Sequence, residues 1–428
     1  MNPSNYDLII VGGGIPGMTL ACSLRETKLS IAVVEVQSEQ QVSDRDLAYA
    51  LAPLSAKIFR EIGIWEQIAP AICHFSRVVL SDENYPHRVE FTPADVGEPA
   101  VYYCAEHRIV HQALQRQLAA SPTVTCSYET HLQVLHYGAK LAEVLVKNTQ
   151  GQQRLLAPLV VAADGANSWV RQQAGIKTKS WIYGQACITT VVSPARDHQN
   201  VAYEKFWCSG PFAILPLPHN RCQVVWIVPC QKANAIASLP PKQFIAAMQQ
   251  RYGDHDGPLQ LLSQPLVFPA RLMHSYRYCQ TRLALLGDAA HGCHPVGGQG
   301  LNMGIRDAAL LSQVLQTAQQ KGEDLGNLAI LNRYGHRRRL ENSAILLFTN
   351  LLNHTFSNRW WPLVIARRGL LQLMIAWTPL RRLILRLMTG LWGKQMLLSD
   401  EKKMASQPHL LPDWYPSSST QQQEDLET

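Results

Sequence analysis

The sequence has few of the features that would place it in a specialised structural class. Charged residues make up only 17% of its 428 residues, and no two of its ten cysteines have the CxxC spacing that is typical of zinc sites and dithiol motifs. A chain of this length buries a core without disulfides, so we expect free thiols in a reducing compartment. The opening residues, MNPSNYDLIIVGGG, lack a basic segment before the apolar run, so no secretory signal is expected.

What the sequence does contain is the pattern of an α/β protein. Its length exceeds the usual limit of one hydrophobic core, which predicts two domains and a terminal extension. Helix periodicity is weak between 180 and 275, where strand-like runs alternate with Pro and Gly, and this indicates a mainly β domain. The predicted strands cover 6–11, 31–34, 155–162, 212–217, 224–228 and 283–286, and the predicted helices cover 16–25, 110–118, 301–319 and most of 330–394.

The first glycine-rich loop follows a predicted strand and opens a helix, and Gly12, Gly14 and Gly17 satisfy GxGxxG. In such a loop the first glycine makes the tight turn, the second lets the backbone approach a pyrophosphate, and the third permits close helix–strand packing. The helix N-terminus offers free N–H groups to the phosphates. Glu35, at the end of the next strand, is placed to accept hydrogen bonds from ribose hydroxyls. The motif does not separate NAD from FAD, and a glycine turn without a ligand is the alternative.

Two later motifs narrow the choice. Residues 164–171 read DGANSWVR, a DGxxSxxR pattern that could equally be a turn into a helix capped by Ser168. Residues 287–304 read GDAAHGCHPVGGQGLNMG, and Asp288 ends a predicted strand, where its carboxylate can bond ribityl hydroxyls. The glycines let backbone N–H groups approach a flat ring, and the dipole of the following helix stabilises a reduced flavin. For His291 we favour packing and a hydrogen bond to the loop backbone over catalysis.

The three motifs, in this order and at these separations, resemble the signature of the FAD-dependent aromatic hydroxylases, the single-component flavoprotein monooxygenases. Within that family the sequence is most similar to the hydroxylases of ubiquinone biosynthesis, also through Gly63-Ile64-Trp65, the stretch FWCSGPFAILPL at 206–217, and Trp226. The resemblance implies a Rossmann-like FAD-binding domain of the p-hydroxybenzoate hydroxylase type, with an inserted mainly β substrate domain and a C-terminal helical segment. The expected segments are FAD-binding parts at 1–75, 76–178 (with interleaved substrate-domain strands) and 276–330, a β-rich substrate domain at 179–275, a basic helical segment at 331–398 and a disordered tail at 399–428.

The resemblance also implies a set of site residues. The family's flavin-contacting arginine usually lies three residues before the alanine of Ala50-Leu51, but that position holds Leu47, so Arg45 is the candidate in its place. Pro295, Gly297 and Gly300 are expected to form the catalytic loop that excludes water beside the isoalloxazine. His219 and His274 are candidates for a phenol base by residue type alone, and no metal site is expected. The residues implied in FAD binding are Gly12, Gly14, Gly17, Glu35, Arg45, Asp164, Gly165, Arg171, Gly287, Asp288, Gly298, Gln299, Leu301 and Asn302.

The activity that the resemblance implies is aromatic hydroxylation. NAD(P)H reduces the flavin, O2 adds to form a C4a-hydroperoxide, and one oxygen atom passes to an activated ring. The sequence has no second GxGxxG, which fits transient binding of NAD(P)H. We expect a prenylated phenol or quinol precursor of a ubiquinone-type or plastoquinone-type quinone as substrate. The alternatives are another flavoenzyme of the same fold, such as a polyprenyl reductase or cyclase, and a flavin-bound accessory subunit of a quinone-synthesis complex.

The C-terminal third carries a basic segment. Residues 331–394 contain eleven Lys and Arg residues and one acid, Glu341. The longest charge-free span within 359–388, residues 369–380, is 12 residues long, shorter than the roughly 20 that a membrane-spanning helix needs. We expect this segment to lie in a membrane interface, where Trp and Arg are favoured, and the protein to be cytoplasmic and peripherally attached. A helical hairpin packed on the FAD-binding domain with solvated arginines is the alternative, and no nucleic acid partner is expected.

Overall fold

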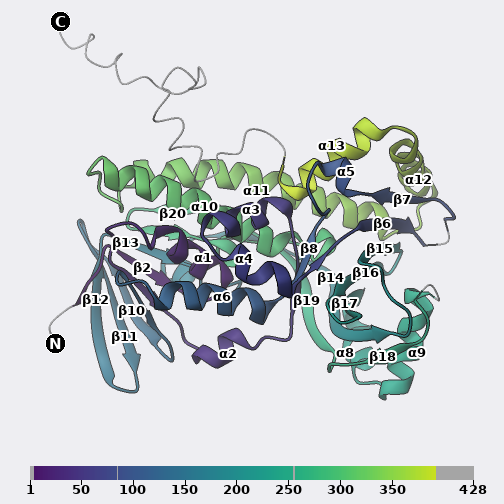
Figure 1. Cartoon of the computed structure of the whole chain (residues 1–428). Coiled ribbons are helices and arrows are strands. Elements are labelled where there is room, and N and C mark those ends of the chain that lie inside the picture. The colour runs from purple at the N-terminus through teal and green to yellow at the C-terminus, as the bar shows by residue number, and fades with distance from the viewer. Residues whose placement is uncertain (1–3, 84, 254–255, 392–428) are drawn as a thin grey trace, which may run out of the picture.

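The structure is a computed structural model that describes residues 4–83, 85–253 and 256–391. Figure 1 shows two parts side by side, each built on a sheet, with the long helix α11 (Leu328–Phe356) running across both. The tail predicted to be disordered, 399–428, lies outside the described residues.

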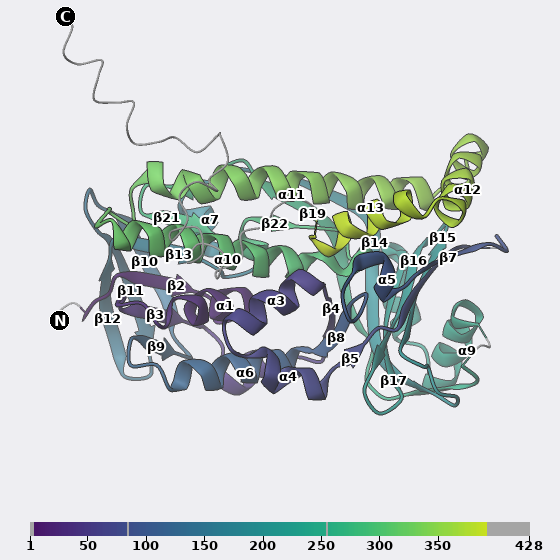
Figure 2. The same cartoon turned by 45° about the horizontal axis from the view of Figure 1, so that its top comes forward.

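The first part is built on a six-stranded sheet of order β20-β21-β13-β2-β3-β9, parallel except for the β20–β21 pair. Every residue of β2, β3 and β13 is buried, as expected of parallel strands that are covered on both faces. Helix α1 (Ile15–Leu24) contacts α10 (Gln299–Gln320) and α6 (His107–Ala119), and Figure 2 shows α10 lying along α11. The strands are β2 (Leu8–Val11), β3 (Ile31–Val34), β9 (Val124–Ser127), β13 (Leu159–Ala162), β20 (Cys279–Gln280) and β21 (Leu283–Leu285).

The single strand predicted over 155–162 is in fact two strands in different sheets. β12 ends at Ala157 and β13 begins at Leu159. Pro158 separates them, because proline has no N–H with which to continue a ladder. β12 belongs to a four-stranded sheet of order β1-β12-β11-β10 at the outer end of this part. Its strands are β1 (Ser4–Asn5), β10 (His131–Tyr137), β11 (Ala142–Asn148) and β12 (Gly151–Ala157).

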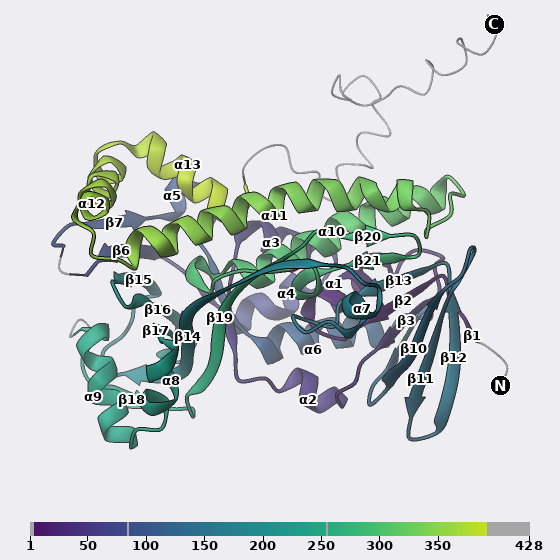
Figure 3. The ribbon, with the colours of Figure 1, turned by 180° about the vertical axis from the view of Figure 1, so that it is seen from behind.

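The second part is built on a nine-stranded sheet of order β22-β19-β14-β17-β16-β15-β6-β7, with β18 beside β14. β14 and β19 are long, and Figure 3 shows them reaching from the large sheet to the first part. The chain before residue 92 contributes β6 and β7 to this sheet. The strands are β6 (Arg77–Asp82), β7 (Arg88–Phe91), β14 (Thr178–Pro194), β15 (Val201–Trp207), β16 (Gly210–Leu217), β17 (Arg221–Pro229), β18 (Leu259–Leu261), β19 (Leu266–Ser275) and β22 (His291–Gly292).

Two helices, α8 (Cys230–Ala237) and α9 (Pro241–Tyr252), lie in the region predicted to be mainly β. The spacing of Phe244, Met248 and Tyr252 at intervals of four is a helix signal that the sequence analysis missed. These side chains pack into a core cluster with strands of the large sheet. The helices therefore cover one face of this sheet and leave the other face toward the first part.

The remaining described strands and helices are short. β4 (Ala48–Leu51), β8 (Tyr103–Glu106) and β5 (Cys73–His74) form a three-stranded sheet. The short helices are α2 (Glu39–Ser43), α3 (Pro53–Glu61), α4 (Trp65–Ile68), α5 (Pro93–Val96) and α7 (Trp169–Gln173).

The basic C-terminal segment forms α11 and a bent helix pair, α12 (Trp361–Ala376) and α13 (Thr378–Thr389). The alternative to membrane contact was a packed helical hairpin with solvated arginines. Three of the arginines in this segment instead form ion pairs within the protein. Arg338 pairs with Asp307 at 2.7 Å, Arg367 with Asp82 at 2.9 Å and Arg381 with Asp95 at 2.9 Å. Asp82 lies in β6 and Asp95 lies in α5, so the last two ion pairs fasten α12 to the large sheet and α13 to α5.

Candidate functional site

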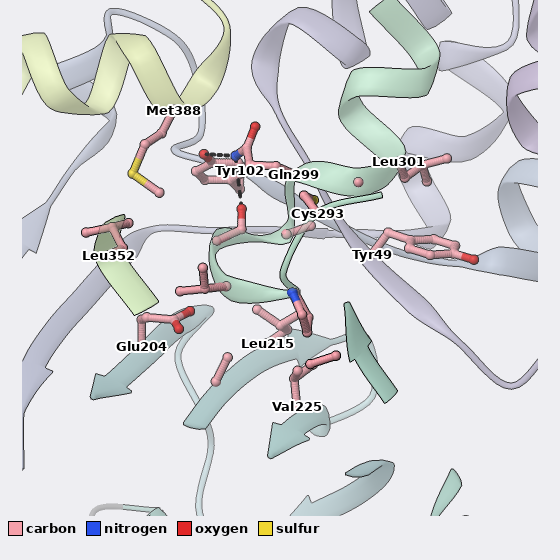
Figure 4. Close-up of a pocket in the computed structure, with 18 of the residues that line it drawn as sticks. Tyr49, Tyr102, Glu204, Leu215, Val225, Cys293, Gln299, Leu301, Leu352 and Met388 are labelled. Carbon is pink, nitrogen blue, oxygen red and sulfur yellow. Dashed lines mark hydrogen bonds between the residues drawn. The ribbon is translucent and has the colours of Figure 1, made fainter. Parts of the chain in front are cut away.

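A cavity of about 760 Å³ lies between the two parts of the molecule. One end is lined by polar groups and glycines of the predicted motifs, including Gly14, Arg45, Gly165 and Asp288. The other end is lined mainly by apolar side chains of the large sheet and of α11, α12 and α13, as Figure 4 shows for Leu215, Val225 and Leu352. The cavity thus joins a polar compartment to an apolar one.

The glycines of the first motif have different roles. A Cβ atom at Gly12 would lie 2.2 Å from the Ala163 carbonyl oxygen, and one at Gly17 would lie 2.2 Å from the Gly12 carbonyl oxygen. These two positions admit no side chain because the backbone itself is in the way. A Cβ atom at Gly14 would have no protein atom within 4 Å, and Gly14 lines the cavity. Gly12 and Gly17 therefore shape the turn, while Gly14 keeps open the space in front of α1.

Glu35 and Arg45 lie beside this loop. The Glu35 carboxylate accepts hydrogen bonds from the backbone N–H groups of Gly13 at 2.6 Å and Gln37 at 2.9 Å. Arg45 is exposed, lines the cavity and donates to the Gln37 side chain at 2.6 Å. Leu47, at the family's usual arginine position, also lines the cavity. Arg45 thus reaches the same compartment from two residues earlier in the chain.

The second motif is held together largely by its own hydrogen bonds. Ser168 caps α7 and accepts from the Arg171 N–H at 3.0 Å, and Asp164 accepts from the Val170 N–H at 3.1 Å. The Arg171 guanidinium is buried and donates to the Ala289 carbonyl at 2.8 Å, which ties this motif to the third one. Of the predicted residues here, only Gly165 lines the cavity. Asp164 and Arg171 therefore support the site from behind.

The third motif forms the wall between the two compartments. Gly297 and Gly298 have φ angles of 70° and 59°, which L side chains rarely adopt, and Gly298 caps the N-terminus of α10. The stretch 295–301 lines the cavity. Asp288 is open to the cavity, and burial within the surrounding protein raises the pKa of its carboxyl. Gly287 lies outside the lining and packs its Cα face against Pro16 of α1.

Asn302 fixes the position of this loop. Its side-chain oxygen accepts from the Ala52 N–H at 2.8 Å and from the Ser55 hydroxyl at 2.7 Å. Its side-chain nitrogen donates to the carbonyls of Ala50 at 2.7 Å and Gly298 at 2.8 Å. The amide is fully engaged within the protein, so Asn302 acts by holding the loop against β4.

A buried charge cluster lies behind the loop. Asp307 contacts His291 at 2.5 Å and Arg338 at 2.7 Å, and all three side chains are almost entirely buried. Burial alone would raise the pKa of Asp307, but His291 and Arg338 outweigh it and lower that pKa. His291 thus has the structural role favoured from the sequence, although its partner is a carboxylate and not the loop backbone. No sequence motif indicated Arg338, which lies on a different helix, α11.

The two histidines named as phenol bases by residue type do not face the cavity. His219 lies exposed in the turn between β16 and β17. His274 contacts the Tyr278 hydroxyl at 3.0 Å, and burial lowers its pKa to about 4. In their place the cavity presents Tyr102 and Glu204, for which the sequence analysis found no signal because long-range packing decides which side chains face inward. Figure 4 shows Tyr102 beside Gln299, with 3.5 Å between the hydroxyl and the amide nitrogen.

The polar compartment fits FAD. The N-termini of α1 and α10 both open on it, and each provides free N–H groups for anionic groups of a ligand. Gly14 leaves room for phosphates, and the left-handed glycines of the third motif let backbone approach a flat ring. Asp288 supplies a carboxylate for hydroxyl groups between the two. These features provide for the phosphates, the hydroxyl chain and the flat ring of a dinucleotide.

Comparison with known proteins agrees with this assignment. The family "FAD binding domain" matches residues 5–349. The ubiquinone hydroxylase UbiL of Rhodospirillum rubrum is 35% identical over 385 residues, which cover 89% of this chain and 88% of that protein. The 3-demethoxyubiquinol 3-hydroxylase of Escherichia coli is 32% identical over 361 residues, which cover 83% and 91%.

Among solved structures, p-nitrophenol 4-monooxygenase PnpA from Pseudomonas putida superposes with a TM-score of 0.76 at 18% identity, covering 92% of this chain and all of that one. At this identity the likeness shows the fold. It confirms the predicted fold class, a Rossmann-like domain combined with a mainly β domain and C-terminal helices.

Proposed function

The chain belongs to the FAD binding domain family, as an FAD-dependent monooxygenase, and from that membership we propose that it hydroxylates the ring of a prenylated phenol or quinol precursor of ubiquinone type. The names of the two relatives given above refer to ubiquinone and ubiquinol, which supports this substrate class. The structural observation that carries the proposal is the continuous cavity. It leads from the flavin compartment directly into an apolar compartment suited to a ring with a hydrocarbon tail.

Each part of the cavity has a distinct task in this function. Bound FAD, reduced by NAD(P)H, supplies the activation of O2. The N-terminus of α1 and Gly14 would hold the pyrophosphate of FAD, and Asp288 would hold its ribityl chain. Pro295, Gly297 and Gly300 shield the ring compartment from water, which protects reactive oxygen species from side reactions.

The apolar compartment positions the substrate. Side chains of the large sheet surround the space next to the 295–301 loop, and Leu371, Met374, Leu385 and Met388 of α12 and α13 line it farther out. A prenyl tail in contact with these side chains leaves water and is stabilised by about 25 cal/mol per Å² of buried apolar surface. The aromatic ring then lies at the loop and the tail points toward α12 and α13.

The test of the proposal is a mass spectrum of prenylated quinones and their precursors in a strain that lacks this protein. The expected result is loss of a quinone and accumulation of a precursor that lacks one or more oxygen atoms. A precursor that differs only by pairs of hydrogen atoms would contradict hydroxylation and favour a reductase of the same fold. An unchanged quinone pool would contradict the proposed substrate class.

We also propose that α12 and α13 bind the surface of a membrane. Their outer face exposes Trp361 by 70% and Trp377 by 53%, together with Trp360, Ile365 and Leu383. Among the described residues no single helix is long and apolar enough to cross a bilayer, although α12 and α13, bent by 107°, pass that test of length and composition as a pair. Exposed Trp beside Arg suits the bilayer interface. Because the opposite face of the same helices lines the cavity, a membrane-borne substrate would enter between them.

Sedimentation with vesicles of phosphatidylcholine and phosphatidylglycerol tests this contact. We expect the full-length protein to bind, and replacement of Trp361 and Trp377 together by Ser to weaken binding about tenfold or more, since each Trp can bury about 150–250 Å². Val134→Ser is the matched control, because Val134 is 52% exposed on β10 at the other end of the molecule. Equal binding of the double variant and the control would exclude α12 and α13 as the membrane contact.

A further inference from the structure

Glu204 is the one carboxyl group, among the described residues, that faces the apolar compartment. The only other carboxyl group in the lining of the cavity is Asp288, at the flavin end. Glu204 lies in the middle of β15, opposite Ala213 of β16 and Leu80 of β6, and both of these neighbours also line the cavity. Figure 4 shows its carboxylate pointing into the space beneath the loop that carries Gln299. A titratable carboxyl group is thus held among apolar side chains at the place where the ring of a substrate would lie.

The Glu204 carboxylate has no partner within the described part of the protein. No hydrogen bond or ion pair joins it to another described residue. The next residue along the strand, Lys205, projects from the other face and donates to the Tyr252 carbonyl, so it does not neutralise Glu204. Enclosed polar groups are almost always hydrogen-bonded, since leaving one without a partner costs about 1–3 kcal/mol. The Glu204 side chain is only partly buried and is open to the cavity, so a ligand that fills the cavity has to supply the hydrogen-bond partner that the protein does not.

The charged and titratable groups on the surrounding elements leave Glu204 without a counter-charge. Asp82 of β6 is already held by Arg367 and Arg368 of α12. Arg306 of α10 donates to Gln299, on the far side of the loop. Burial raises the pKa of the Tyr102 hydroxyl, and the nearby Glu204 carboxyl adds a smaller rise.

We propose that the Glu204 carboxylate accepts the hydrogen bond of the ring hydroxyl of the substrate and removes its proton as the ring is hydroxylated. This rests on the proposed function, in which the substrate is a phenol or quinol. The O–H bond of the substrate breaks, its proton forms an O–H bond at a Glu204 oxygen, and the electron pair stays on the phenolic oxygen. Delocalised into the ring, that pair makes the carbon to be hydroxylated more nucleophilic toward the oxygen that O2 and reduced FAD supply.

The acidity of the two groups suits this transfer. Burial raises the pKa of Glu204 to about 8. A phenol in water has a pKa of about 10, close enough for transfer within a short hydrogen bond, whereas an ordinary carboxylate near 4.3 is a much weaker base. A general base of this kind typically contributes a factor of about 10² to 10⁴ to the rate.

The first part of the test is binding without turnover. The probe is a phenol that carries one short prenyl group, titrated into the holoenzyme and followed by the flavin absorbance between about pH 6 and pH 9. The phenol donates more strongly to a carboxylate than to a carboxylic acid, so its Kd should fall as the pH rises through about 8. In Glu204→Gln the Kd should not change with pH. The methyl ether of the same phenol cannot donate a hydrogen bond, and it should bind without pH dependence to both proteins.

The second part is turnover. We expect Glu204→Gln to keep its FAD content and its rate of flavin reduction by NAD(P)H, to hydroxylate the probe about 10²- to 10⁴-fold more slowly, and to release hydrogen peroxide instead. Glu204→Asp keeps a carboxyl group and should therefore retain the pH dependence of binding. It also provides a test of the proposal if the Glu204→Gln protein fails to fold. Glu90→Gln, on β7 outside the cavity, is the control for loss of a carboxylate.

The outcomes separate this inference from the proposed function. If Glu204→Gln shows wild-type hydroxylation and the wild-type pH dependence of phenol binding, Glu204 is not the proton acceptor, and the hydroxylase assignment stands. If the wild-type protein hydroxylates no phenol, the proposed function fails. The binding titrations of the two proteins still decide in that case whether Glu204 contacts a phenolic hydroxyl.

Discussion

The substitution Gly14→Ala tests the cofactor site without disturbing the fold. Gly14 has φ −70° and ψ 172°, an extended conformation that alanine adopts freely, and an added Cβ atom would meet no protein atom within 4 Å. The apoprotein should therefore fold normally, and the smaller entropy of its unfolded chain should stabilise it by about 0.4–1 kcal/mol. The added methyl group would enter the space reserved for the pyrophosphate in front of α1.

The expected loss of FAD affinity follows from that steric conflict. A methyl group forced into a close-packed contact costs about 1–3 kcal/mol, which corresponds to FAD binding about 5- to 150-fold weaker. Titration of the apoprotein with FAD, followed by quenching of flavin fluorescence, measures the change, and thermal unfolding of the apoprotein checks the fold.

Two glycine variants serve as controls. In Gly17→Ala the Cβ atom would lie 2.2 Å from the Gly12 carbonyl oxygen, so this apoprotein should be destabilised. Gly369→Ala, at an exposed site in α12, should bind FAD normally. A Gly14→Ala protein that folds and binds FAD with the wild-type Kd would refute the placement of the pyrophosphate at this loop.

Three further substitutions test other parts of the account. Asp288→Ala should purify with little or no FAD, because the ribityl chain loses its carboxylate; a fully yellow protein would contradict this. Asp307→Asn should lower the free energy of unfolding by up to about 3–5 kcal/mol in urea titrations, because it removes the buried carboxylate that pairs with His291 and Arg338 and leaves Arg338 only the partly exposed Glu341. The control Glu323→Gln, in an exposed pair, should cost less than about 1 kcal/mol. Equal losses in the two variants would be inconsistent with a buried ion pair. Glu204→Gln should become more stable relative to the wild-type apoprotein as the pH rises. The wild-type carboxyl group has a pKa raised to about 8 in the folded state, so its contribution to stability is fully present below its unfolded pKa of about 4.3 and is lost as the pH approaches 8. The difference in the free energy of unfolding between the two proteins should grow by at most about 1.4 kcal/mol per pH unit. A difference that is constant between about pH 5 and pH 8 would argue against the raised pKa of Glu204.

The sequence signals for the flavin end of the site are local, and several of the residues that carry them line the same cavity. Each motif is a short run in which a strand, a glycine loop and a helix follow one another, so Gly14, Gly165, Asp288 and the 295–301 loop could be placed without knowledge of distant contacts. It could not separate glycines that face the cavity from those that only shape a turn. Gly12 and Gly14 look alike in the sequence, and only the position of the Ala163 carbonyl distinguishes them.

The substrate end could not be predicted in this way because it depends on long-range packing. Glu204 faces inward only because β15 pairs with β6, more than a hundred residues earlier in the chain. The partner of Asp307 is Arg338, on a separate helix. The apolar run over 155–162 was predicted to be one strand, but Pro158 divides it into two strands. A continuous apolar run therefore does not show where a single proline ends a strand.

The most direct test of the central claim is the fate of molecular oxygen in the purified holoenzyme. The protein would be given NAD(P)H, a phenol with a short prenyl tail and O2 labelled with oxygen-18, and the product would be analysed by mass spectrometry. The account predicts a product with one additional ring hydroxyl that carries the label, and no product without O2. A product that lacks the label, or that forms equally well without oxygen, would contradict it.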